Sequence, residues 1–256
     1  MIVLDLEERV RLVTQYDHSI ISGELAKHVK DDYFHGLERK EEVVIAITEH
    51  DRAWIPLDEA PLLNQENMKP VSFQHYPLEP KVEAYIQGID EVEAKSLYAA
   101  FLCSMHYASF FAGMEEDERV RPFLNHEANR RKRLAEKEQI TEEDEAVLFH
   151  FKLLQFFDNV SLYICLNPPN CAKEKEISWF RNGFAQTFSW NNKETIKPAF
   201  INETTVGLSF SPFVHAPVVD LPYKMIDKSA IEKIGLQKAY HDAKQEVISF
   251  TYQSIR

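Results

Sequence analysis

The segment from Thr141 to Leu166 constrains the fold most strongly, because its apolar residues recur at helical spacing along its whole length. Its first residues, 141–144, resemble a helix capping box, and Asn167-Pro168-Pro169-Asn170 ends it, since proline cannot continue a helix. Further helical periods occur over 8–29, 40–51 and 90–113. The sequence therefore predicts a mainly α fold for residues 1–170.

The pattern of the chain changes after Cys171. Three later segments alternate aromatic or β-branched residues with polar ones, and turn residues separate them: ISWFRNGFAQTFSW, TTVGLSFSPF and EVISFTYQ. Such alternation is typical of antiparallel strands. We therefore expect a helical domain over 1–170 and an antiparallel β-rich module over 171–256. The module should pack on the helices, because no Gly/Ser-rich linker precedes it.

The net charge restricts the partners of the chain. It contains 29 Lys and Arg against 41 Asp and Glu, which gives a formal net charge of −12. This excess repels phosphate backbones and anionic lipid, so we expect no nucleic-acid partner and no membrane partner. Three cysteines without a CxxC pair support neither a disulfide framework nor a thiolate zinc site. With no signal peptide and no membrane-spanning run, the expected location is the cytoplasm.

Several polar residues lie on helix faces that are otherwise apolar. Asp158 is the most informative, since it interrupts the apolar face of the last long helix, where aspartate is rarely left without a partner. His18, His106 and the pair His50-Asp51 lie on the inward faces of other helices. A salt bridge to a buried arginine would satisfy Asp158 alone. A divalent metal ion would satisfy the whole set, because imidazole and carboxylate are suitable ligands for Zn, Mn, Fe or Ni.

The order His18, His50-Asp51, Asp158 resembles the H…HD…D pattern of the HD-domain superfamily. The surrounding segments also resemble an uncharacterised, mostly bacterial family known only as a domain of unknown function. The superfamily resemblance implies an HD-like helical bundle with metal-dependent phosphohydrolase activity on nucleotides or other phosphate esters. It implies metal ligation by His18, His50, Asp51 and Asp158, a catalytic role for His50 and Asp51, and His106 as a ligand of a second ion.

The resemblance implies one or two divalent ions as cofactor, drawn from Mn, Fe, Zn, Ni, Co and Mg. Cations expected near a bound phosphate are Arg52, Lys69, Arg130 and Arg131. Lys69 lies in the proline-rich segment 55–90, which we expect to form a stiff rim around the site. Arginine suits bidentate phosphate contacts. However, Arg130 and Arg131 are also spaced for salt bridges with Glu127, the interpretation that we favour for them.

The sequence leaves three functions open. The first is a divalent-metal-dependent phosphohydrolase of a small phosphorylated molecule or nucleotide. The second is a non-catalytic HD-like protein that binds a metal, a ligand or a partner, and the third is a di-iron HD-like oxygenase. No P-loop, Rossmann glycine motif or serine-hydrolase elbow occurs in the sequence. The oligomeric state is also open, and a homodimer is one option.

Overall fold

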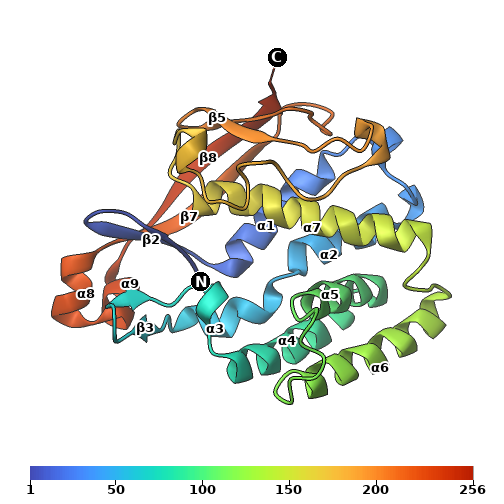
Figure 1. The fold of residues 1–256 in the computed structure, drawn as a ribbon, viewed down its shortest axis with the longest axis horizontal. Coiled ribbons are helices and arrows are strands. Elements are labelled where there is room, and N and C mark those ends of the chain that lie inside the picture. The colour runs from blue at the N-terminus through green and yellow to red at the C-terminus, as the bar shows by residue number, and fades with distance from the viewer. Residues whose placement is uncertain (256) are drawn as a thin grey trace.

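The computed structural model of the protein describes residues 1–255 and combines a six-stranded sheet with a layer of helices. Figure 1 shows α7 crossing the middle of the molecule, between the sheet and the group formed by α4, α5 and α6. The α-helices are α1 (Gln15–Lys27), α2 (Lys40–Glu49), α3 (Ile55–Glu59), α4 (Leu78–Glu93), α5 (Leu97–Ser109), α6 (Arg121–Glu138), α7 (Glu145–Leu166), α8 (Lys228–Ile234) and α9 (Leu236–Asp242). None of the helices within residues 1–255 combines the length and the apolar character needed to cross a bilayer.

The six strands of the main sheet lie in the order β1-β2-β7-β8-β6-β5. Their bounds are β1 (Ile2–Asp5), β2 (Arg9–Val13), β5 (Pro198–Asn202), β6 (Thr205–Leu208), β7 (Val218–Asp227) and β8 (Gln245–Ser254). Neighbouring strands are antiparallel except β6 and β8, which are parallel. A separate two-stranded ribbon contains β3 (Leu63–Asn64) and β4 (Lys69–Pro70).

This sheet shows that the prediction of a mainly α fold, a helical bundle followed by a β-rich module, is wrong. The fold is mixed α/β, because strands from both ends of the chain share one sheet. β1 and β2 form a hairpin, and β2 pairs antiparallel with β7. The predicted helix over 8–29 is therefore a strand followed by α1. The sequence was misleading here because four consecutive residues of β2, 10–13, are buried, which hides the two-residue alternation of a strand.

Two other segments also differ from their predicted structure. The predicted helix over 90–113 is divided, since α4 ends at Glu93 and Ser96 caps α5 by accepting a hydrogen bond from the Ala99 amide at 3.1 Å. The aromatic segment 177–190, predicted as strand, is formed by turns and a short 3-10 helix. Its buried phenylalanines are Phe180, Phe184 and Phe188. Their four-residue spacing does not fit the two-residue period of a strand.

One hydrophobic core joins the two ends of the chain. It contains Ile2 of β1, Val160 of α7 and Tyr252 of β8. The Tyr252 hydroxyl also donates a hydrogen bond to Val160 O at 3.0 Å. Residues 171–255 therefore pack directly on the helices. Whether the predicted ranges 1–170 and 171–256 fold separately stays a prediction for limited proteolysis.

His150 on α7 gives the fold a dependence on pH. Its Nε2–H donates to His35 O at 2.7 Å and its Nδ1 accepts from the Tyr98 hydroxyl at 2.6 Å, so the ring is neutral. Burial lowers its pKa to about 4, against about 6.5 for an unfolded histidine. The unfolded chain therefore binds a proton more readily than the folded one. This contribution to stability is complete above pH 6.5 and is lost as the pH falls towards 4.

We expect His150→Gln to flatten the acid side of the stability profile. Between pH 6.5 and 4.5 the free energy of unfolding should fall less steeply than in the parent protein, by up to about 1.4 kcal/mol per pH unit. Urea denaturation at several pH values measures this slope. His241→Gln is the control, because His241 is exposed. Equal slopes in the His150 variant and the parent protein would contradict the assignment.

Candidate metal centre

Three histidines and two aspartates from four helical elements meet in the interior. His18 lies on α1, His50 at the end of α2 with Asp51 directly after it, His106 on α5 and Asp158 on α7. The first four are at most 4% exposed, whereas the Asp158 side chain is 16% exposed. The structure thus brings together all five residues that the sequence analysis selects as metal ligands.

Glycines allow the close helix contacts that bring these side chains together. A β-carbon at Gly23 of α1 would lie 2.0 Å from Thr48 Oγ1 of α2. A β-carbon at Gly88 of α4 would lie 2.6 Å from the Cα of Ala53, in the turn that follows Asp51. No larger residue fits at either contact without moving its neighbour. The spacing of α1, α2 and α4 around the centre therefore depends on these two glycines.

The side-chain atoms lie at the separations expected of ligands that share an ion. His18 Nε2 lies 2.8 Å from Asp51 Oδ2 and 3.9 Å from Asp158 Oδ1. His50 Nε2 lies 3.8 Å and 3.6 Å from the same two oxygens. His106 Nε2 lies 3.7 Å from Asp158 Oδ2. Atoms about 2.1 Å from one ion lie roughly 3–4 Å from each other, so only small movements are needed to coordinate one.

Hydrogen bonds orient the ligand side chains. His50 Nδ1–H donates to Ile47 O at 2.7 Å, which directs Nε2 towards the centre. His18 Nδ1 is hydrogen-bonded to Ser161 Oγ at 2.7 Å. The side-chain amide of Gln15 donates from Nε2 to Asp51 Oδ2 at 3.0 Å. Each of these contacts fixes the angle at which a ligand faces the others.

Burial and neighbouring charges shift the pKa values of three members of the cluster. Burial disfavours ionisation of Asp158, but the nearby histidines, His50 first, lower its pKa to about 2. Burial also disfavours the charged form of His50, but Asp51 and Asp158 raise its pKa to about 9. For His106 burial prevails, and its pKa falls to about 4. Near neutral pH the centre therefore combines the ionised Asp158 with a positively charged His50 and a neutral His106.

These residues are able to hold a metal ion. Two overlapping groups, His18–His50–Asp51 and His50–His106–Asp158, each place ligand atoms within 4.8 Å of one another. Within residues 1–255, His50 Nε2 and both nitrogens of His106 are buried without a hydrogen-bond partner. Buried polar atoms of this kind are costly and rare. A cation between the imidazoles and the carboxylates would satisfy His50 Nε2 and His106 Nε2, so the donor set fits such an ion.

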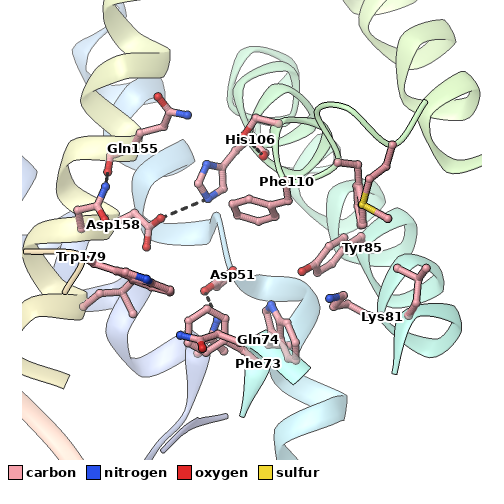
Figure 2. Close-up of a pocket in the computed structure, with 18 of the residues that line it drawn as sticks. Asp51, Phe73, Gln74, Lys81, Tyr85, His106, Phe110, Gln155, Asp158 and Trp179 are labelled. Carbon is pink, nitrogen blue, oxygen red and sulfur yellow. Dashed lines mark hydrogen bonds and ion pairs between the residues drawn. The ribbon is translucent and has the colours of Figure 1, made fainter. Parts of the chain in front are cut away.

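A cavity of about 490 Å³ lies against the cluster. Asp51, His106 and Asp158 reach into it, as Figure 2 shows. One part of its wall is aromatic and includes Phe73, Tyr85, Phe110 and Trp179. Another part carries the carboxamides Gln15, Gln74, Gln155, Asn159 and Gln186. The centre is therefore accessible to a small molecule with both apolar and uncharged polar groups.

The four cations that the sequence analysis places near a phosphate do not line this cavity. Each is paired with carboxylates: Arg52 with Glu49 and Glu91, Lys69 with Asp5, Arg130 with Glu127, Glu93 and Asp90, and Arg131 with Glu142. The salt bridge between Arg130 and Glu127 is the one favoured from the sequence, whereas Arg131 uses a different partner. The structure thus leaves these four residues away from the candidate site.

Gln15 and Lys81 are among the cavity residues that the sequence analysis does not select. Gln15 lies one helical turn before His18 on α1, a spacing that could have indicated it. Lys81 lies in the proline-rich segment 55–90, which does line the cavity through residues 73–85. Much of that segment is α4 rather than a long loop. Recognition of this helix would have placed Lys81 and Tyr85 on one face, four residues apart.

Taken together, the fold and the cluster define a mixed α/β protein with a buried His/Asp centre beside a cavity. The chain belongs to the family described as "Protein of unknown function (DUF3891)", whose model matches residues 1–228. The predicted resemblance to an uncharacterised family is thereby confirmed. The family match does not extend to the HD-domain superfamily. No curated protein and no solved structure matches the chain.

Gln15 gives a prediction for the metal centre. Gln15→Met should weaken metal binding about 10–100-fold, because Asp51 loses the amide that orients it while all five ligands stay in place. Titration of the metal-free protein with Zn²⁺ against a competing chelator measures the affinity. Gln186→Met is the matched control, since Gln186 lines the same cavity but is not hydrogen-bonded to a ligand within the described residues. Equal affinities in the two variants would contradict the orienting role.

Proposed function

We propose that the protein is a divalent-metal-dependent hydrolase that acts on a small phosphate ester. The observation that carries the proposal is the convergence of His18, His50, Asp51 and Asp158 beside a cavity large enough for a small molecule. The order of these residues along the chain is that of the HD-domain superfamily, although the architecture is mixed α/β. Membership of the chain in that superfamily is part of this proposal.

The five residues of the centre have different roles in binding a metal ion. Asp51 and Asp158 supply the negative charge that holds a cation, and His18 and His50 supply neutral nitrogen ligands once His50 has lost its proton. His106 is neutral above its pKa of about 4 and, with His50 and Asp158, completes the second group of ligands. When bound, a divalent ion supplies Lewis acidity, which activates water and offsets the charge of a phosphoryl group. The two overlapping groups favour a centre for one or two ions.

The cavity supports a small substrate. Its aromatic wall excludes water from one side of a ligand, and its carboxamides offer hydrogen bonds to hydroxyl or carbonyl groups. Figure 2 shows Asp158 and His106 on one side of this space, with Tyr85 and Lys81 across from them. A phosphate ester seated between the two sides would place its reacting group at the metal ligands. We therefore expect turnover of a phosphomonoester or nucleotide rather than of a polymer.

Metal analysis combined with an activity screen tests the proposal. The purified protein should contain one or two equivalents of a divalent ion, and a panel of phosphate esters should be hydrolysed with Mn, Co, Fe, Zn, Ni or Mg. Removal of the ion by a chelator should abolish activity. His50→Ala and Asp51→Ala should lose both metal and activity, and His241→Ala, which changes an exposed histidine, should lose neither.

Two outcomes would overturn the proposed hydrolase activity. Full metal occupancy without turnover above the His50→Ala/Asp51→Ala double variant would favour a non-catalytic metal-binding protein. Absence of metal after reconstitution with each of these ions would reject the metal centre as well. Far-UV circular dichroism of the variants must match that of the parent protein, so that loss of metal is not loss of fold.

A further inference from the structure

Lys81 is the cation that faces the cavity. It projects from α4 into the space in front of Asp51 and Asp158, beside Tyr85 (Figure 2). Among the cavity-lining residues of the described chain, it is the one lysine or arginine. The wall at this point is aromatic and aliphatic, with Leu78 one helical turn before Lys81. A positive charge thus lies at the edge of an otherwise apolar surface.

Lys81 also differs from three cations that the sequence analysis selects, Arg52, Arg130 and Arg131. Within residues 1–255 no carboxylate lies within ion-pair distance of its ammonium group, and its side chain makes no hydrogen bond to the protein. Arg52, Arg130 and Arg131 are all paired. Burial alone lowers the pKa of Lys81, with no neighbouring charge to offset it. An unpaired, partly buried ammonium group is unfavourable unless something anionic meets it.

The rest of the cavity wall limits what the anion is attached to. Beyond the metal ligands and Lys81, the polar groups of the described lining residues are uncharged: five carboxamides, the hydroxyl groups of Ser109 and Tyr85, and two indole N–H groups. The rings of Phe73 and Trp179 meet edge to face, with centroids 6.3 Å apart, and add apolar surface. No further cation is present among the described lining residues to balance a second anionic group. The wall is therefore complementary to an uncharged body that carries one anionic group.

We propose that Lys81 is the specificity-determining residue of the cavity: it binds the phosphoryl group of a ligand that has a single phosphoryl group on an uncharged body. The identity of the anion as a phosphoryl group rests on the proposed function. The ammonium group takes one side of the phosphoryl group and the metal centre takes the other. Neutral esters gain no affinity from Lys81. A ligand with an additional carboxylate is repelled by Asp51 and Asp158, because no second lysine or arginine lines the described part of the cavity to offset that charge.

Binding of inorganic phosphate to the metal-loaded protein tests the role of Lys81 without requiring turnover. Calorimetry should show phosphate binding at least about tenfold weaker in Lys81→Met than in the parent protein, because a charge-assisted hydrogen bond is lost. Lys81→Arg should restore most of the affinity. Metal content should be the same in all three proteins. Lys132→Met is the matched control, since Lys132 is exposed on α6.

A pair of related ligands tests the requirement for an uncharged body. Glycerol 3-phosphate and 3-phosphoglycerate share a three-carbon skeleton, but the second carries a carboxylate in place of a hydroxymethyl group. We expect 3-phosphoglycerate to bind at least about tenfold more weakly to the metal-loaded protein. Equal or tighter binding would overturn the single-anion specificity.

The outcomes separate this inference from the proposed function. Unchanged phosphate affinity in Lys81→Met and Lys81→Gln, whether or not esters are hydrolysed, would overturn the inference. Phosphate binding that depends on Lys81 without any turnover would support Lys81 as the anion-binding residue and reject the hydrolase. If esters are hydrolysed, Lys81→Met should raise KM for a chromogenic phosphomonoester and leave metal content unchanged. A merely structural lysine would not give that separation.

Discussion

Replacement of Asp158 by asparagine is expected to weaken metal binding by more than about 100-fold and to abolish activity with it. Asp158 belongs to one of the two ligand groups, and its oxygens lie 3.6–3.9 Å from the Nε2 atoms of His50, His106 and His18. Asparagine keeps the shape of the side chain and removes the charge. The three imidazoles then lose the anion that links them, and a cation loses one of two carboxylates.

The same substitution should also destabilise the metal-free protein, by about 3 kcal/mol, because it leaves the charge of His50 less well compensated in a buried site. Elemental analysis and urea denaturation measure the two effects. Glu145→Gln is the matched control, since it neutralises an exposed carboxylate in the first turn of the same helix. Normal metal content in Asp158→Asn would exclude Asp158 as a ligand and with it the shared centre.

The residues of the metal centre could be predicted from the sequence because burial of a charge leaves a clear signal. Asp158 lies in an apolar helix face with Phe156 and Phe157 as neighbours, and such a position demands a partner wherever the helix packs. His18 and His50 follow the same logic on α1 and α2. Helical periodicity indicates which way a side chain faces. It therefore selected five side chains that the structure brings together, although the predicted fold class was wrong.

The sheet could not be predicted in the same way. β2 is buried along four successive residues, including the charged Arg11, so its sequence lacks the alternation that marks a strand with one solvated face. Its pairing with β7 joins residues more than 200 positions apart, for example Val10 and Ile226. No local pattern reports such a contact. The segments TTVGLSFSPF and EVISFTYQ, which the sequence analysis expects to be strands, contain β6 and β8, whereas β7 was not expected.

The lysine and arginine residues show why sequence distance does not predict which cations lie at the site. Arg52 was selected because it follows Asp51 directly, and Arg130 because arginine suits phosphate contacts, yet Arg52 pairs with Glu91 of α4 and Arg130 pairs with Asp90 of α4 as well as with Glu127. A charged side chain on a helix surface finds its partner through tertiary packing, which sequence distance does not measure. Lys81 was missed for the converse reason: α4 brings it to the cavity from a segment that the prolines made look irregular.

The second large effect is expected at Arg11, which links the sheet to the helix that carries Asp158. Its Nη2 donates to three carbonyl oxygens at the end of α7, those of Ile164, Cys165 and Asn167, at 2.7, 3.0 and 3.3 Å. Arg11 is 4% exposed, and burial lowers its pKa. The end of a helix leaves carbonyl groups without partners and carries a partial negative charge. A guanidinium group satisfies both requirements at once.

Arg11→Met should therefore lower the free energy of unfolding by roughly 3–5 kcal/mol, since three buried carbonyl groups lose a charged donor while the apolar stem is retained. The melting temperature should fall by about 10 °C. Arg11→Lys should recover only part of the loss, because one ammonium group cannot reproduce the fixed geometry of a guanidinium group. Thermal and urea denaturation of the metal-free protein measure the effect apart from metal binding.

Arg9→Met is the matched control for this prediction, because Arg9 lies two residues away on the same strand and is exposed. It should change stability by less than about 0.5 kcal/mol. A similarly small effect of Arg11→Met would mean that desolvation of the guanidinium group cancels its hydrogen bonds, so that the end of α7 is held by packing alone. A large loss of stability with normal metal affinity in the folded protein would mean that Arg11 stabilises the fold without affecting the metal centre. Weaker metal binding by the folded variant would instead show that the β2–α7 contact also sets the position of Asp158, about two turns of helix before the end of α7 that Arg11 caps.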